Sequence, residues 1–183
     1  MKEIALNILD IVGNSVRAQA KNIRIEIIES DQSNSLVIKI IDDGKGMDKD
    51  FLDKVDDPFT TSRHTRRVGL GIPLLKQHAE LAGGVFSIQS YPEKGTTVSA
   101  EFRKDHIDRQ PIGDICGVLR LLLLSESEID FEYYHSTDKG EYEFSGNEAK
   151  KILEVDDLND IGLVDEIINI LNNNLIGINA QIT

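Results

Sequence analysis

Apolar and polar residues at the start of the chain follow first a helical and then a strand-like pattern. An amphipathic helix is predicted over residues 2–20, because apolar side chains recur there at helical spacing. Those positions are Ile4, Ile8, Ile11 and Val12. Residues 22–29 and 35–42 instead alternate with a period of two on either side of a polar loop, which predicts a β-hairpin or two neighbouring strands.

A long irregular segment separates this part from a second helix. Residues 49–55 fit a short helix or turn, and residues 56–71 have no apolar periodicity, as is typical of a long mobile loop. Pro73 suits the first turn of a helix that runs to about Leu81, where a glycine pair stops it. The strands of a second β-hairpin, on either side of a PEKG turn, are predicted at 85–91 and 96–102.

The pattern changes after Phe102. The elements predicted there are a helix over 113–125, a hairpin with strands at 129–136 and 140–145, and helices from Asn147 and about Gly162. The order helix, strands, loop, helix, strands in the first hundred residues favours an α+β fold, with a helical layer on a mixed, mainly antiparallel sheet. We therefore expect a main domain over 1–103 and a small C-terminal α+β appendage over 104–183.

Composition indicates a globular protein without membrane spans. The chain has 183 residues, 40% hydrophobic and 28% charged, which is enough for one ample domain with an appendage and does not favour disorder. The stretch GVLRLLLL is too short to cross a bilayer and contains Arg120. No signal-peptide pattern opens the chain. The single cysteine, Cys116, excludes an intrachain disulfide and disfavours a cysteine-based zinc site, so a cytoplasmic protein is expected.

The net charge of −12 is concentrated in the second part of the chain. Residues 1–103 carry 14 Lys and Arg against 15 Asp and Glu, whereas residues 104–183 carry 6 against 17. This acidic part disfavours a nucleic-acid partner. It is either a solvated surface or a surface that docks a partner protein.

The predicted first helix contains Gly13-Asn14-Ser15, three poor helix formers in a row. Glycine alone costs about 1 kcal/mol against alanine in a helix interior. The amide oxygen of Asn14 is a suitable ligand for Mg²⁺ beside phosphate oxygens. Asp10 lies one turn earlier on the same face, where it could orient or deprotonate a water near a γ-phosphate, and Arg17 could neutralise phosphate charge. The alternative is an exposed polar face with an incidental glycine.

Two further stretches could recognise a purine base. Asp42 ends a predicted strand and could accept a hydrogen bond from an adenine amino group, while Gly44 and Gly46 would let the backbone pass close to the ring. Thr96 follows Gly95 at the start of a strand, and its hydroxyl could join the Asp42 hydrogen bonds, directly or through water. The alternatives are an ordinary Asp-Gly turn, a hairpin start, or a calcium loop, although the acids lack EF-hand spacing.

The stretch TTSRHTRRVGLGIPLLK combines hydroxyls, arginines and glycines at a helix start. Backbone N–H groups next to glycine, together with the positive end of the helix, favour an anion. No Gly-Lys-Ser/Thr sequence is present, so this is not a P-loop. The candidate phosphate-binding residues are Arg63, Gly69, Leu70 and Gly71. The alternative is a solvated basic loop.

The four stretches, in this order, resemble the boxes of the GHKL superfamily of ATPases: gyrase, Hsp90, histidine kinases and MutL. The matching residues are Asp10 with Asn14-Ser15, Asp42-Asp43-Gly44-Lys45-Gly46-Met47, Gly69-Leu70-Gly71-Ile72 and Gly95-Thr96. The resemblance covers residues 1 to about 103. It implies the family's two-layer α/β sandwich, the Bergerat-type ATP-binding fold, with ATP under a flexible lid and Mg²⁺ held by Asn14.

Details resemble the histidine-kinase branch most. DPFTTSR is similar to the kinases' phenylalanine box, GLGIPLLK to their GLGLAIVK, and Arg17 stands where they carry a basic residue. Two positions depart from the family pattern. Arg67 replaces the first lid glycine, and Asp10 stands where ATP-hydrolysing members commonly carry Glu, which puts efficient activation of water in doubt.

Two classes of function are compatible with this resemblance. The first is a stand-alone ATP-dependent kinase or signalling ATPase that acts on a partner protein, as anti-sigma-factor serine kinases of this superfamily do. The second is a nucleotide switch, in which ATP binding with little turnover changes what the acidic C-terminal part contacts. We expect no phosphoacceptor helical hairpin before the domain, and His106 in HIDRQP is either part of a linker or an acceptor. A DNA-repair clamp is disfavoured by Arg17 and by the acidic C-terminal part.

Overall fold

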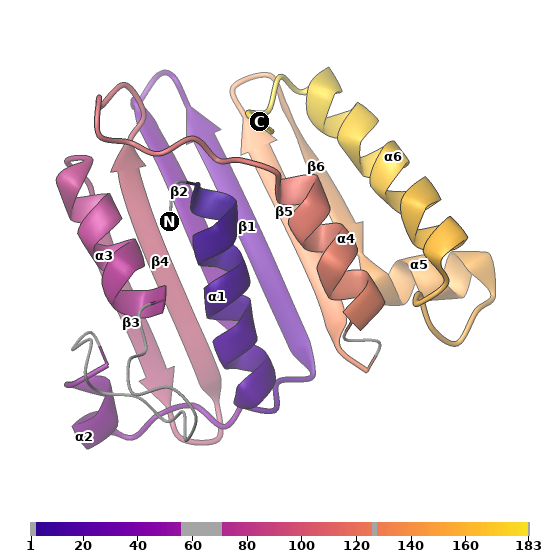
Figure 1. Ribbon diagram of the computed structural model, residues 1–183, viewed down its shortest axis with the longest axis horizontal. Helices are drawn as coiled ribbons and strands as arrows, with labels where there is room; N and C mark the ends of the chain where they lie inside the picture. Colours follow the sequence, from indigo (N-terminus) through magenta and orange to yellow (C-terminus); the bar gives the residue numbers. More distant parts are fainter. Residues whose placement is uncertain (1–2, 56–70, 126–127, 183) are drawn as a thin grey trace.

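The computed structural model describes residues 3–55, 71–125 and 128–182, which form one open sheet with helices on one face (Figure 1). Its strands are β1 Asn22–Ser30, β2 Ser35–Asp42, β3 Val85–Tyr91, β4 Gly95–Arg103, β5 Asp130–Thr137 and β6 Gly140–Ser145. They lie in the order β3-β4-β2-β1-β5-β6. β1 and β5 are parallel and the other neighbours are antiparallel, which confirms the mixed, mainly antiparallel sheet.

The helices lie where the sequence pattern predicted them, with small changes at their ends. They are α1 Ile4–Arg17, α2 Lys49–Leu52, α3 Gly71–Leu81, α4 Ile115–Ser125, α5 Gly146–Leu153 and α6 Ile161–Gly177. α1, α3 and α4 lie side by side over the same face of the sheet, and α6 packs against α4 and β6 (Figure 1). Among the described residues, no helix is long and apolar enough to cross a membrane. The predicted loop over 56–71 lies outside the described residues except for Gly71.

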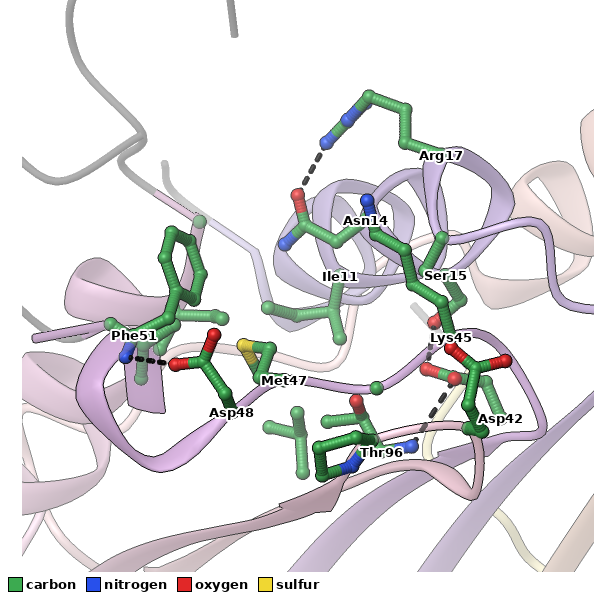
Figure 2. A pocket seen from close by; sticks show the side chains of 18 residues that line it. Ile11, Asn14, Ser15, Arg17, Asp42, Lys45, Met47, Asp48, Phe51 and Thr96 are labelled. Carbon is green, nitrogen blue, oxygen red and sulfur yellow. Dashed lines mark hydrogen bonds between the residues drawn. The ribbon is translucent and has the colours of Figure 1, made fainter. Parts of the chain in front are cut away.

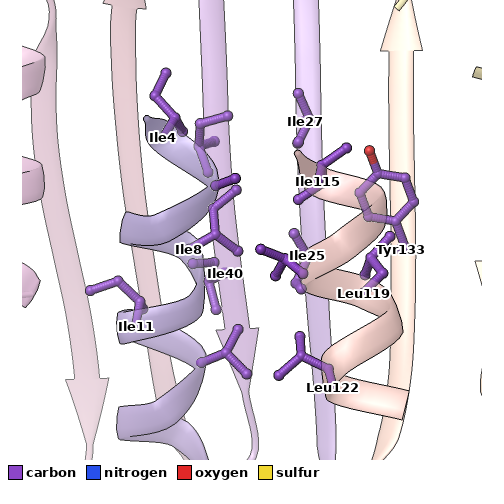
Figure 3. Packing of buried hydrophobic residues seen from close by; sticks show 14 of the residues in the cluster. Ile4, Ile8, Ile11, Ile25, Ile27, Ile40, Ile115, Leu119, Leu122 and Tyr133 are labelled. Carbon is purple, nitrogen blue, oxygen red and sulfur yellow. The ribbon is translucent and has the colours of Figure 1, made fainter. Parts of the chain in front are cut away.

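Alternate side chains of the central strands and one face of α1, α3, α4 and α6 form the core, and Figure 3 shows the part under α1 and α4. Ile25 and Ile27 of β1 are fully buried beneath the helices, and so is Ile8 of α1. The period of two along the strands and of 3.6 along α1 therefore converge on one apolar layer. The other face of the sheet carries polar and charged side chains, of which Arg24 pairs with glutamates 26, 132 and 143.

The C-terminal part of the chain continues the same sheet. Tyr133 of β5 is the register partner of Ile25 in β1, and both side chains are fully buried. Ile115 and Leu119 of α4 cover them, as Ile8 of α1 covers the neighbouring part of the sheet (Figure 3). The predicted appendage therefore has its own helices and hairpin, but it shares one sheet and one core with the preceding residues.

A buried polar cluster fixes this junction at the end of β1. The Glu29 carboxylate accepts a hydrogen bond from the backbone N–H of Gln181 at 2.7 Å and lies 2.9 Å from Nε2 of the buried His135. The ammonium group of Lys104 lies 3.2 Å from its other oxygen. Burial opposes ionisation of Glu29, but the contacts with His135, Gln181 and Lys104 outweigh it and lower the pKa of Glu29 below the ordinary 4.5. Through these contacts Glu29 connects the turn after β4, strand β5 and the C-terminal end of the chain to β1.

Candidate functional site

A cavity of about 460 Å³ opens at the end of the sheet where β2 stops and β4 begins. This volume falls in the range of small-molecule sites, roughly 300–1,000 Å³. Four separate parts of the chain line it: α1, the segment from β2 into α2, the start of α3, and the β3–β4 turn with the start of β4 (Figure 2). Asn14, Arg17, Asp42, Gly46, Gly71 and Thr96 are among the lining residues. Six predicted site residues from distant parts of the sequence thus meet at one cavity.

Asp42 is the buried acid of this cavity, with 8% of its surface exposed. One carboxylate oxygen accepts hydrogen bonds from the backbone N–H groups of Gly44 and Thr96, at 2.9 and 3.2 Å. The other oxygen accepts a hydrogen bond from the hydroxyl of Ser15 at 2.6 Å (Figure 2). The oxygen that Ser15 contacts still has acceptor capacity beyond that bond, because a carboxylate oxygen has two lone pairs. Asp42 is therefore a fixed hydrogen-bond acceptor in the cavity wall.

Ser15 is a positioning residue, and no role was assigned to its hydroxyl from the sequence. It lies on the inner face of α1 and is buried. Its hydrogen bond to Asp42 joins α1 to the end of β2. The available signal was its place, since a serine that continues the helical spacing of Ile8 and Ile11 needs a polar partner in the interior.

The glycines after Asp42 make room for neighbouring protein backbone. A Cβ at Gly44 would lie 2.8 Å from the carbonyl oxygen of Ala18, so the glycine allows the turn after α1 to approach, and Gly44 is not among the residues that line the cavity. Gly46 lines the cavity, has a φ of +63°, and a Cβ there would lie 2.0 Å from the carbonyl oxygen of Tyr91. The segment is held on both sides, because Lys45 donates its N–H to Ala18 and accepts from the N–H of Glu93.

Thr96 reaches Asp42 through its backbone, whereas its hydroxyl has another partner. The hydroxyl of Thr96 lies 2.8 Å from that of Ser90, which also accepts a hydrogen bond from the N–H of Met47 at 2.8 Å. Ser90 is the register partner of Thr96 in β3. Ser90 follows Phe86 and Ile88 on the inward face of that strand. A serine at the end of this apolar series was the feature of the sequence that could have identified Ser90 as a site residue.

Asn14 and Arg17 lie together on the last turns of α1. The guanidinium group of Arg17 donates a hydrogen bond to the amide oxygen of Asn14 (Figure 2). The amide oxygen that was predicted to bind Mg²⁺ therefore already contacts a positive charge. This contact is consistent with a role of that oxygen as a ligand for a cation. The described residues contain no group of three or more His, Cys, Asp or Glu side chains that could hold a metal ion by themselves. A magnesium ion here would depend on Asn14 together with phosphate oxygens and water.

Asp10 lies beside the first residue of α3 and does not line the cavity itself. A Cβ at Gly71 would lie 3.2 Å from the Cβ of Asp10 and 3.7 Å from a carboxylate oxygen of Asp10. The glycine thus allows α3 to begin directly against α1, and the positive end of α3 lies next to an acid. Ile72, the next residue, lines the cavity.

The remaining predicted site residues lie outside the described residues. They are Arg63, Gly69 and Leu70, and Arg67, which replaces the first lid glycine, lies there too. Their roles stay predictions. His106 is described, and it lies in the turn after β4, whereas Thr96 lies at the opposite end of that strand. At 3.3 Å per residue the two ends are roughly 26 Å apart, so His106 does not belong to this cavity.

Comparisons with known proteins identify the family of residues 2–106. Residues 2–106 match the family described as histidine kinase-, DNA gyrase B-, and HSP90-like ATPase. Sporulation kinase A of Bacillus subtilis (strain 168) is 27% identical over 104 residues, which are 57% of this chain and 16% of that kinase. DNA mismatch repair protein MutL of Clostridium acetobutylicum is 32% identical over 97 residues, 52% of this chain and 15% of that protein. The N-terminal domain of a DNA repair protein aligns over 80% of this chain and 52% of that one, with 17% identity and a TM-score of 0.46.

The chain belongs to the family of histidine kinase-, DNA gyrase B-, and HSP90-like ATPases. The predicted membership of the GHKL superfamily is thereby confirmed, and histidine kinases and a MutL protein are both among its relatives. The chain spans about a sixth of the length of the curated relatives it matches. The family match ends at residue 106, shortly after β4.

Proposed function

We propose that this protein binds Mg·ATP in the cavity between α1, β2 and α3. The observation that carries the proposal is the convergence of Asn14, Asp42 and Thr96 on one cavity from three distant parts of the chain. Asp42 would accept a hydrogen bond from the adenine amino group, which is the donor on that edge of the base. The Met47 and Val98 side chains and Ile11 supply the apolar surface that a purine ring needs.

The polar end of the cavity suits the phosphates. Asn14 would hold Mg²⁺, which supplies charge neutralisation between phosphate oxygens when it is bound. Arg17 would exchange its bond with Asn14 for one with a phosphate group. The start of α3 at Gly71 offers backbone N–H groups and the positive end of a helix. We place Arg63, Gly69 and Leu70 in the same phosphate-binding role.

For the reaction, we propose a stand-alone ATP-dependent protein kinase or signalling ATPase that acts on a partner protein. Asp10 would orient or deprotonate the attacking group, because it lies on α1 one turn before Asn14 and beside the start of α3. The acidic residues of 104–183 would dock the partner. Transfer to His106 would require a second copy of the chain, since His106 lies at the far end of β4.

The second candidate is a switch that binds ATP with little or no turnover. The shorter side chain of Asp10 favours it, because an aspartate reaches one methylene less far than the glutamate of hydrolysing members. In this case nucleotide binding itself would change what residues 104–183 contact.

Isothermal titration calorimetry with Mg·ATP tests the site. We expect Asn14→Ala to abolish Mg²⁺-dependent binding and Asp42→Asn to weaken binding about tenfold or more, the loss of a hydrogen bond to a charged group. Asn173→Ala and Asp156→Asn are the matched controls, because both residues are exposed and lie away from the cavity. Wild-type affinity in both site variants would reject the site.

ATP labelled at the γ-phosphate separates the two candidates. Label on the protein or on a captured partner, or steady release of phosphate, supports the enzyme, whereas binding without transfer or release supports the switch. Asp10→Asn should leave affinity nearly unchanged and slow any turnover about 100-fold, the ordinary contribution of a general base. Equal turnover in wild type and Asp10→Asn would remove Asp10 from this role, and Asp50→Asn is the exposed control.

A further inference from the structure

Residues 110–113, which we call the strap, connect the ATPase part of the chain to α4 across the start of α1 (Figure 1). The carbonyl oxygens of Pro111 and Ile112 accept hydrogen bonds from the N–H groups of Ile4 and Ala5, at 3.0 and 2.7 Å. α1 has no side-chain cap at its N-terminus, so the strap satisfies N–H groups that a helix otherwise leaves unpaired. The backbone of the strap therefore caps the N-terminus of α1.

The strap also leads directly into α4, and packing and hydrogen bonds hold the connection in place. Ile112 is fully buried, and the N–H of Ile115, the first residue of α4, donates to the carbonyl of Gly113 at 2.8 Å. Gly113 has a φ of +79°, and a Cβ there would lie 2.4 Å from a carboxylate oxygen of Glu3. Movement of the start of α1 must therefore displace the strap and the start of α4 with it.

A partly buried cluster of two amides and an imidazole joins the strap to both helices of the nucleotide site. Nδ2 of Asn7 in α1 lies 3.4 Å from Oε1 of Gln110 and 3.5 Å from Nδ1 of His78 in α3. Nε2 of Gln110 lies 3.3 Å from the other ring nitrogen of His78. We call these three residues the amide–imidazole junction. It is the place where α1, α3 and the strap meet.

The junction can form hydrogen bonds in more than one way. Asn7 is fully buried, and its Oδ1 has no hydrogen-bond partner among the described residues. A neutral imidazole donates from one nitrogen and accepts at the other, and each amide can present oxygen or nitrogen by rotating. The bonds present are long, and one acceptor is spare. Small changes in the spacing of α1 and α3 can therefore select another arrangement at little cost.

The cavity and the junction lie at opposite ends of the same helix pair. Asn14 and Gly71 line the cavity, and Asn7 and His78 lie two turns away along α1 and α3, about 10 Å at 1.5 Å per residue. A ligand that contacts both helices at the cavity has different affinities for different spacings of the pair, and it thereby shifts the spacing at the junction.

We propose that the strap transmits the occupancy of the nucleotide site to the C-terminal segment, through the amide–imidazole junction of Asn7, His78 and Gln110. This proposal rests on nucleotide binding in the cavity and adds how that binding reaches α4. The coupling requires no contact between nucleotide and C-terminal segment, because α1 and α3 are rigid connections between the two.

Amide hydrogen exchange followed by NMR, with and without saturating AMP-PNP and Mg²⁺, tests the coupling. The reporter amides are those of Ile4 and Ala5, bonded to the strap, and of Val118 in α4, bonded to the carbonyl of Asp114 just before that helix. We expect the nucleotide analogue to slow their exchange about fivefold or more, the low end of ordinary coupling between sites. The amide of Asn34, bonded to Asp31 in the β1–β2 turn, is the reference and should not change.

Gln110→Ala removes the strap's side chain from the junction, and Gln77→Ala, an exposed residue next to His78, is its control. We expect the response of Val118 to disappear in Gln110→Ala and to persist in Gln77→Ala. An unchanged Val118 in the saturated wild type would overturn the proposal, and so would equal slowing at Asn34 or a full response in Gln110→Ala. The wild-type measurement decides even if Gln110→Ala does not fold. Calorimetry that detects no binding to the wild type would instead reject the nucleotide site itself.

Discussion

At the scale of single residues, the site depends on Asp42 and on the donors that hold it. Two backbone N–H groups and the hydroxyl of Ser15 fix the carboxylate, and this arrangement does not require a ligand. A side chain held by protein donors keeps its direction when a ligand arrives, so little ordering cost is added to binding. Preorganisation of Asp42 is thus the residue-level basis of the proposed adenine recognition.

Ser15→Ala should lower the free energy of unfolding by about 1–3 kcal/mol. The substitution leaves a buried carboxylate oxygen of Asp42 without its hydroxyl donor, and that is the usual cost of an unpaired buried polar group. Urea denaturation followed by circular dichroism measures it. Ser87→Ala, at an exposed position of β3, should change stability by less than about 0.5 kcal/mol. Equal stability of the two variants would contradict the role given to Ser15.

At the scale of elements, turns with special backbone geometry place the site. The segment from Asp43 to Met47 is held between the turn after α1 and the β3–β4 turn. Gly46 has a positive φ and sits against the carbonyl of Tyr91. Because this approach leaves no space for a side chain, the segment can follow the cavity wall closely only with glycine at that position.

Gly46→Ala should destabilise the protein by at least about 2 kcal/mol and reduce nucleotide affinity. Alanine pays about 1–2 kcal/mol for the left-handed backbone conformation, and its Cβ would also collide with the Tyr91 carbonyl. Gly177→Ala in α6 is the matched control, since a Cβ there meets nothing within 4 Å. The control should be neutral or stabilising by up to about 1 kcal/mol. Thermal unfolding that ranks the two variants equally would count against this account of Gly46.

At the scale of the whole molecule, the sheet unites the family domain with the residues that follow it. The parallel pairing of β1 with β5 places Tyr133 and His135 in the common core, and Glu29 ties them to Lys104 and the C-terminal end. Tyr133 donates to or accepts from His135 at 2.6 Å, and burial raises the pKa of Tyr133 well above its ordinary value. The chain therefore behaves as one packed body at the described residues.

The contacts of Glu29 predict a specific loss of stability in acid. The pKa of Glu29 is lower in the folded protein than its ordinary 4.5, because contacts from His135, Gln181 and Lys104 outweigh burial. Its contribution is therefore fully present above pH 4.5 and is lost as the pH falls through the lower folded pKa. Urea denaturation from pH 7 to pH 3 should show a smaller acid-induced loss in Glu29→Gln than in wild type. Glu101→Gln, an exposed control, should follow the wild-type curve, and an unchanged acid loss in Glu29→Gln would contradict this role.

The sequence by itself determined the local elements and the candidate residues of the site. Helical spacing in α1, alternation in the strands and the glycine-bearing motifs around Asn14, Asp42 and Thr96 are local properties, since each depends on residues within a few positions of one another. The motifs could be recognised as a set because their order along the chain is itself part of the sequence. The roles of Arg63, Gly69 and Leu70 stay predictions.

Only the tertiary structure decided how these pieces meet. The alternation of residues 129–136 predicted a strand, but it contained nothing about pairing with β1, because a strand's pattern specifies its faces and leaves its neighbour open. The bond of Ser15 to Asp42, the partnership of Ser90 with Thr96 and the junction of Asn7 with His78 and Gln110 likewise join residues far apart in sequence. Such contacts exist only after the chain has packed, since they arise from the positions of whole helices and strands.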